Sequence, residues 1–199
     1  MKKYLKFTLL MTLLSNLLVA DVVFDLGAQQ LSNSVDGDYI DATYDAGDSI
    51  VSTGLAQVNG YYRAKEYRTG HFSVQVKQPK TQWAVSFNMY VYLAYNRADG
   101  SSITLTSSNG QAINIYIERE HIAVEGTTLD TGLSGGEVIS GTIQKNGNNI
   151  DIIINGSYVF HISKPNFKLE QFNIILATDS SNYIDYIDKL NNLTISTSN

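Results

Sequence analysis

The stretch that most constrains the fold is residues 142–160, TIQKNGNNIDIIINGSYVF. Two Asn-Gly pairs, Asn146-Gly147 and Asn155-Gly156, interrupt a run of alternating isoleucines. Asn-Gly favours the positive backbone dihedrals of a tight hairpin, and apolar alternation with a period of two favours strands with one buried face. The stretch therefore predicts a β-meander.

The longest strand pattern is residues 82–95, QWAVSFNMYVYLAY, in which side chains alternate between two faces. The face predicted to enter the core consists of Trp83, Val85, Phe87, Met89, Val91 and Leu93. Other strand patterns cover residues 22–24, 71–78, 103–106, 112–118, 121–125, 167–179 and 193–196. The glycine-rich sequence of residues 126–136 predicts a surface loop. No stretch shows a sustained period of 3.6. Roughly ten or more strands predict an all-β domain of two packed antiparallel sheets, because one open sheet would leave an apolar face uncovered.

The first twenty residues, MKKYLKFTLLMTLLSNLLVA, begin with lysines, continue with a short apolar run and end on a small residue. This order predicts a secretory signal peptide cleaved after Ala20 and a single mature domain of residues 21–199. An N-terminal core helix or a retained membrane anchor is the alternative. The chain contains no cysteine, so neither disulfides nor thiolate metal sites are expected.

The charge balance excludes some partners. The chain has 14 basic and 19 acidic residues, and loss of Lys2, Lys3 and Lys6 with the signal peptide changes 14 − 19 = −5 into 11 − 19 = −8. Nucleic acid and anionic lipid both favour a basic protein face, so neither is expected as the main partner. No other stretch reaches transmembrane length, so we expect an exported protein, periplasmic or extracellular, and not an integral membrane protein.

Three stretches support a family resemblance: GTIQKNGNNIDIIINGSYVF, PNFKLEQFNIILATD and YIDYIDKLNNLTI. Their order of strands and turns resembles the C-terminal half of concanavalin A-like lectin and glucanase domains, including the laminin G-like group. The resemblance extends over residues 82–196. It implies a jelly-roll β-sandwich whose concave sheet binds carbohydrate, in some members with a calcium ion at one edge.

The resemblance also implies what an enzymatic member would carry. Members similar to bacterial laminarinases have a Glu-x-Asp-x-Glu run on one strand, which brings the catalytic carboxylates to one face. This chain lacks that run, and its nearest approach is Glu118-Arg119-Glu120. A solvated, charged strand end is the alternative interpretation of these residues. The missing run favours the non-catalytic branch.

A polar, aromatic face is the predicted ligand-binding site. Its members, on two strand patterns, are Asn88, Tyr90, Tyr92, Asn114 and Tyr116. Tyrosine rings cover the C–H faces of sugars while amides hydrogen-bond their hydroxyl groups. The alternative is that these tyrosines pack beneath the N-terminal segment or a loop.

Acidic residues near the mature N-terminus form a predicted metal site. Asp36, Asp38 and Asp41 offer oxygen ligands of the kind that calcium prefers, followed by Asp45 and Asp48. Their spacing does not match an EF-hand loop, and an ordinary acidic loop is the alternative.

Three functions remain open. The leading hypothesis is a non-catalytic carbohydrate-binding or adhesion protein whose partner is a glycan or surface polysaccharide. A second is a glycoside hydrolase or lyase that uses Glu118 and Glu120. The third is an envelope structural domain that binds a protein partner, because one fold can support many functions.

Overall fold

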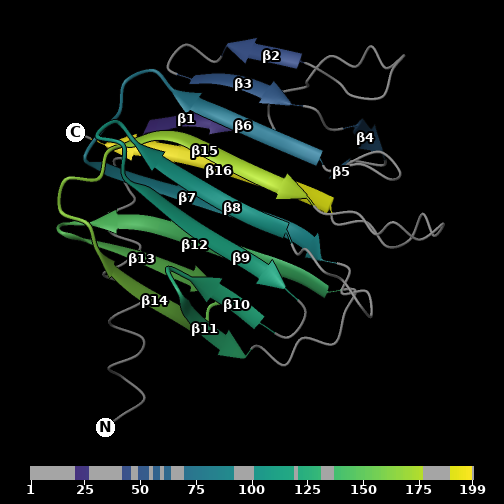
Figure 1. The fold of residues 1–199 in the computed structure, drawn as a ribbon. Helices are drawn as coiled ribbons and strands as arrows, with labels where there is room; N and C mark the ends of the chain where they lie inside the picture. Colours follow the sequence, from purple (N-terminus) through teal and green to yellow (C-terminus); the bar gives the residue numbers. More distant parts are fainter. Residues whose placement is uncertain are drawn as a thin grey trace, which may run out of the picture.

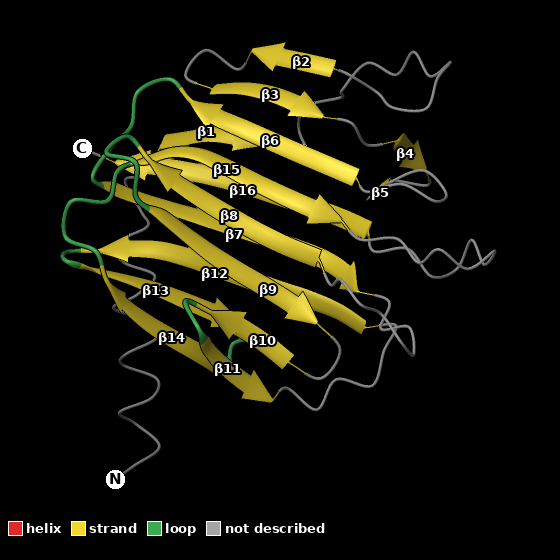
Figure 2. Ribbon diagram, viewed as in Figure 1, coloured by secondary structure: helices red, strands yellow, loops and turns green. Residues whose placement is uncertain are grey.

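The computed structural model describes residues 21–26, 42–45, 49–53, 56–58, 61–63, 70–91, 101–118, 121–130, 137–176 and 189–198. These segments consist of strands and turns (Figure 2). None of the described segments is a helix long and apolar enough to cross a membrane. The predicted signal peptide, residues 1–20, lies outside the described residues.

The described strands form two antiparallel sheets of eight strands each, and Figure 1 shows them as two layers. The first sheet has the order β14-β13-β12-β7-β16-β5-β4, with β1 also paired to β16. Its strands are β1 (Asp21–Asp25), β4 (Ala56–Val58), β5 (Tyr61–Arg63), β7 (Gln82–Val91), β12 (Glu137–Asn146), β13 (Asn149–Ile154), β14 (Tyr158–Ser163) and β16 (Lys189–Ser198).

The second sheet has the order β11-β10-β9-β8-β15-β6-β3-β2. Its strands are β2 (Ala42–Asp45), β3 (Ser49–Thr53), β6 (Gly70–Val76), β8 (Ser101–Ser107), β9 (Ala112–Glu118), β10 (His121–Val124), β11 (Thr127–Asp130) and β15 (Leu169–Leu176). The predicted all-β, two-sheet antiparallel sandwich is confirmed.

The core lies between the inner faces of the sheets and follows the alternation of the sequence. In β7 the predicted inward set from Trp83 to Val91 is buried, and Leu93 lies outside the described residues. The second sheet contributes the alternating isoleucines Ile113, Ile115 and Ile117, which have no exposed surface. The buried indole nitrogen of Trp83 also has a hydrogen-bond partner, because Nε1 donates to the Phe167 carbonyl oxygen over 3.4 Å.

The turns of the predicted meander form as two different hairpins. Asn155 and Gly156 both have positive φ, 50° and 66°, and the Ser157 amide donates to the Ile154 carbonyl over 3.1 Å. This is the geometry that Asn-Gly favours. The first turn is shifted by one residue from the prediction, because Asn146 pairs with Asn149 and leaves Gly147-Asn148 as the loop.

One loop prediction is partly wrong. Residues 127–130, TTLD, form β11 and pair with β10 within the range expected to be a loop. Three of the four residues are exposed, so the segment has little of the buried alternation that identifies a strand in sequence. Backbone pairing with β10 holds these residues in a strand instead.

Gly141 is required by a close approach between β12 and β7. It faces Phe87 across the pair of strands, and a Cβ atom at this position would overlap the Phe87 ring. The glycine therefore leaves room for the aromatic ring within the core.

We expect Gly141→Ala to lower the free energy of unfolding by about 1–3 kcal/mol, because the added methyl group overpacks the site. Urea denaturation measures this change. In a Phe87→Leu background the same substitution should cost less, since the smaller side chain makes room. An equal cost in both backgrounds would contradict the steric explanation.

Lys145 is a charged residue on the core side of β12. It is 5% exposed, and its Nζ donates to the Gly147 carbonyl oxygen in the adjacent turn. Burial removes water from the ammonium group and lowers the pKa of Lys145 below its ordinary value. This residue therefore carries a desolvation cost at neutral pH.

We expect Lys145→Met to raise the free energy of unfolding at pH 7, with an advantage that shrinks as pH rises toward 10.5. Between the lowered folded pKa and the ordinary value of 10.5, the unfolded chain binds more protons than the folded chain, so the unmodified protein gains stability with pH. Urea denaturation at a series of pH values measures the difference. Lys168→Met, which removes one lysine at an exposed position, is the control for the loss of a surface charge.

Candidate functional site

The predicted ligand-binding residues do not form one face. Asn88 and Tyr90 lie on β7 in the first sheet, whereas Asn114 and Tyr116 lie on β9 in the second. Each pair alternates with buried residues, so each points away from the core on an opposite side of the sandwich. The prediction of one shared face is wrong, and Tyr92 lies outside the described residues.

The outer side of the second sheet carries a continuous polar surface, which we call the uncharged face. It consists of 11 outward residues of β6, β8, β9 and β15: Ser73, Gln75, Ser102, Thr104, Thr106, Ala112, Asn114, Tyr116, Gln171, Asn173 and Ile175. Glu170, at the register shift of β15, is half-buried and lies beside this set. Nine of these 11 side chains can donate or accept hydrogen bonds, and none of the 11 carries a formal charge at neutral pH. The side chains of His71 and Glu118 lie outside what the structure describes.

Strand register aligns the uncharged face into rows. Asn173 is paired with Ser73 on one side and with Thr104 on the other, and Thr104 is paired with Asn114. Adjacent strands lie about 4.8 Å apart, so this row of four polar side chains spans about 14 Å. In the next row Ser102 is paired with Tyr116.

Two hydrogen bonds orient the amides of the uncharged face. Thr104 Oγ1 donates to Asn114 Oδ1 over 3.0 Å, so the Asn114 amide nitrogen keeps its donors available. Gln171 Nε2 donates to Ser73 Oγ over 2.9 Å, so the Gln171 carbonyl oxygen remains an acceptor. Donor and acceptor groups are thus set in defined directions before any ligand arrives.

Most residues of the uncharged face were not predicted from the sequence. The outward residues of β6 and β15, such as Ser73 and Asn173, alternate with a core set just as those of β9 do. The signal was present in HFSVQVKQ and QFNIIL. What the sequence lacked was the pairing that brings β6, β15, β8 and β9 side by side.

The chemistry available on the uncharged face is recognition by hydrogen bonds and one aromatic ring. Its described side chains include no carboxylate, imidazole or ammonium group. Glycoside hydrolysis commonly uses a pair of carboxylates, and the predicted pair lies outside the description, since Glu120 and the Glu118 side chain are not described. The face therefore offers binding groups and no described acid–base pair.

The outer side of the first sheet carries a different polar feature. His161 Nδ1 lies 2.7 Å from Asp151 Oδ1 across β13 and β14, with 70% of the His161 side chain exposed. The two residues are ten positions apart in the sequence. Counting outward from a two-residue Asn155-Gly156 loop would have paired Asp151 with Phe160. The observed loop also includes Ser157, so Ile154 pairs with Tyr158 and Asp151 pairs with His161.

The predicted calcium ligands Asp36, Asp38 and Asp41 lie outside the described residues. Within the described segments, no three His, Asp or Glu side chains come close enough together to hold a metal ion. Calcium at the acidic loop stays a prediction.

Comparison with known proteins identifies similar structures but no sequence family. No protein-family model matches the sequence, and no curated protein matches it. The structure is similar to the metal-free carbohydrate recognition domain of Emp46p, with a TM-score of 0.59 at 9% identity over 89% of this chain and 98% of that chain. It is also similar to the Ca²⁺/Man3GlcNAc-bound exoplasmic/lumenal domain of VIP36, with a TM-score of 0.53 at 11% identity over 76% and 84% of the two chains.

A third similar structure is a sialidase, with a TM-score of 0.55 at 11% identity, for which the match covers 91% of this chain and 19% of that chain. At sequence identities this low, the similarity concerns the fold alone. The predicted concanavalin A-like β-sandwich fold is confirmed.

Proposed function

We propose that this chain is an exported, non-catalytic carbohydrate-binding protein that holds a neutral glycan on the uncharged face. One observation carries the proposal: 11 described outward positions on four adjacent strands hold no charged side chain, with Glu170 the described carboxylate beside them, in a chain of which 17% is charged. Outward positions are where soluble proteins usually keep their charges. A surface of amides and hydroxyl groups suits a ligand that is itself rich in hydroxyl groups.

The chemistry of the uncharged face matches both surfaces of a sugar ring. Tyr116 is 49% exposed, so its ring is accessible to the apolar C–H face of a sugar. Asn114 supplies amide donors and Gln171 an acceptor for the hydroxyl groups around it. The two internal hydrogen bonds reduce the conformational entropy lost when a glycan binds.

The ligands and functions of the structural neighbours support the proposal. One is a carbohydrate recognition domain, and the other was crystallised with Man3GlcNAc and Ca²⁺. A calcium ion held by Asp36, Asp38 and Asp41 is part of the proposal, on the strength of their carboxylate chemistry. Export to the periplasm or the cell exterior is likewise proposed, from the signal-peptide pattern of residues 1–20.

The decisive experiment is a glycan array probed with the purified protein, once with calcium and once with EDTA. Specific binding to neutral glycans supports the proposal, and loss of binding in EDTA supports the calcium site. A blank array together with a protein captured from the cell envelope would support the protein-interaction alternative. Turnover of a polysaccharide that is lost in Glu118→Gln would support the hydrolase or lyase alternative.

We expect Tyr116→Ala and Asn114→Ala each to weaken glycan binding about fivefold or more, because a ring contact or hydrogen bond contributes roughly 1 kcal/mol. Isothermal titration calorimetry with the best array ligand measures the affinity. Tyr90→Ala and Asn88→Ala, on the opposite outer face, are matched controls and should leave the affinity unchanged. Weakening by the β7 substitutions alone would assign the ligand to the first sheet.

We also expect the affinity for a neutral glycan to be nearly the same in 50 mM and 1 M NaCl. Salt screens interactions between charges, and the described side chains of the uncharged face carry none. Calorimetry at the two salt concentrations measures this. A large loss of affinity at high salt would contradict binding on this face.

A further inference from the structure

Asn-Gly pairs are chemically reactive as well as turn-forming. Three of them lie in described turns, at Asn109, Asn146 and Asn155, and a fourth, Asn59-Gly60, lies outside the described residues. The glycine amide nitrogen can attack the asparagine Cγ, because glycine has no side chain to hinder the approach. A bond forms between that nitrogen and Cγ, and the glycine N–H proton leaves with the side-chain NH₂ as ammonia. Water then opens the succinimide ring to aspartate or isoaspartate.

Hydrogen bonds around each pair decide how readily this reaction starts. The side chain has to rotate until Cγ faces the glycine nitrogen, and that nitrogen has to lose its proton. A hydrogen bond that holds the side chain opposes the first step, and one that holds the glycine N–H opposes the second, since each bond must break. The three described pairs differ in these bonds.

The pair at Asn109 is held at both reacting groups. Asn109 Nδ2 donates to the Asn166 carbonyl over 3.2 Å and to Gln111 Oε1 over 3.3 Å. Asn109 Oδ1 accepts from the Gln111 amide over 3.1 Å. The Gly110 amide donates to the Ser107 carbonyl over 2.9 Å, so the attacking nitrogen is also engaged.

The pair at Asn155 is held through the side-chain oxygen. Asn155 Oδ1 accepts from the Ser140 amide over 2.9 Å and from the Ser140 hydroxyl over 3.5 Å. The Asn155 amide in turn donates to the Ser140 carbonyl over 2.8 Å. The side chain therefore cannot turn toward Gly156 without losing its attachment to β12.

The pair at Asn146 has neither restraint. Asn146 is exposed, and within the described part of the chain neither its side-chain amide nor the Gly147 N–H forms a hydrogen bond. The turn itself is well defined, because Gly147 has a φ of 59° and Asn148 has no positive φ, as in a type II′ turn. Lys145 Nζ and the Lys164 amide donate to the Gly147 and Asn148 carbonyls, which leaves both reacting groups free.

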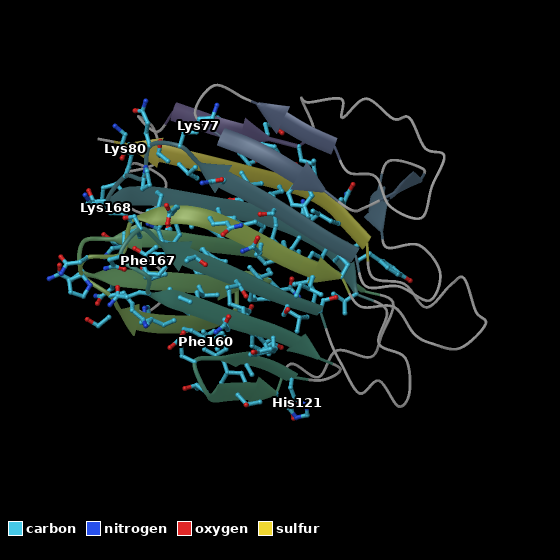
Figure 3. All side chains as sticks on the ribbon, turned by 45° about the horizontal axis from the view of Figure 1, so that its top comes forward. Lys77, Lys80, His121, Phe160, Phe167 and Lys168 are labelled. Atoms are coloured by element: carbon cyan, nitrogen blue, oxygen red, sulfur yellow. The ribbon has the colours of Figure 1, made fainter. Side chains whose placement is uncertain are left out.

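Location does not explain the contrast between Asn109 and Asn146. Both residues are exposed, and the turns of both are hydrogen-bonded to the connection from β14 to β15. Figure 3 shows Phe167 and Lys168 of this connection at one end of the sandwich. The two asparagines thus share an end of the molecule and differ in the hydrogen bonds of their reacting groups.

We propose that Asn146 is a self-modification site, which converts to isoaspartate and aspartate in the folded protein before Asn155 or Asn109 reacts. Isoaspartate adds a main-chain carbon between residues 146 and 147, inside the turn that pairs Asn146 with Asn149. The product therefore loosens the hairpin of β12 and β13 in the first sheet. Because the uncharged face belongs to the second sheet, this inference does not depend on glycan binding.

The test follows the three sites in one sample of the purified protein. The protein is incubated at pH 8 and digested at intervals, and mass spectrometry of the peptides measures the replacement of NH₂ by OH at each asparagine. A parallel incubation in guanidinium chloride gives the three rates without the fold. Asn146→Gln is the control variant, and its peptide should lose the signal assigned to Asn146.

We expect Asn146 to react about fivefold faster than Asn155 and about 25-fold faster than Asn109, at roughly fivefold for each reacting group that is held. In guanidinium chloride the three rates should converge, because glycine follows each asparagine. Equal rates in the folded protein, or an earlier reaction at Asn155 or Asn109, would overturn the proposal. An unreactive Asn146 in the folded protein, beside reaction in guanidinium chloride, would overturn it as well.

Discussion

Apolar contact between the inner faces of the two sheets is the constraint on which the rest of the molecule depends. Isoleucine, valine and phenylalanine side chains fill this layer from every long described strand. Since a strand sends alternate residues to opposite faces, burying one set fixes the direction of the other. The uncharged face is the necessary outer counterpart of Ile103, Ile113 and Phe172, and its position cannot shift without exposing them.

Much of this layer could be predicted from the sequence. The alternation around Phe87 and Ile115 identified core residues correctly, and Asn155-Gly156 identified its hairpin. Each of these features depends on residues near one another in the chain. The prediction of one shared ligand face was wrong because alternation shows only whether a side chain points into or out of the core. It does not show which of the two sheets the strand belongs to. Asn88 and Asn114 both point outward, but in opposite directions, because β7 and β9 belong to different sheets.

The local nature of alternation also explains which residues of the uncharged face were not predicted. Asn173 and Ser73 are 100 residues apart in the chain, and only the pairing of β15 with β6 makes them neighbours. Long-range antiparallel pairing depends on burial along the whole strand, so it leaves no local signature at either residue. The Asp151–His161 pair is close in the chain, but its register depends on a loop of three residues, 155–157, and a two-residue Asn-Gly turn would have paired Asp151 with Phe160 instead.

The same alternation decides which groups the outer surface of the second sheet can offer. Hydrogen bonds on the uncharged face are directional and short in range, so a ligand held there would be distinguished by the arrangement of its hydroxyl groups. The connection from β14 to β15 supports this surface, because the Lys168 amide donates to Ser107 Oγ and the Ser108 amide donates to the Lys168 carbonyl. That connection leads directly into β15, whose Gln171 and Asn173 lie on the uncharged face. The positions of these two side chains therefore depend on the turns at the end of the sandwich as well as on the core.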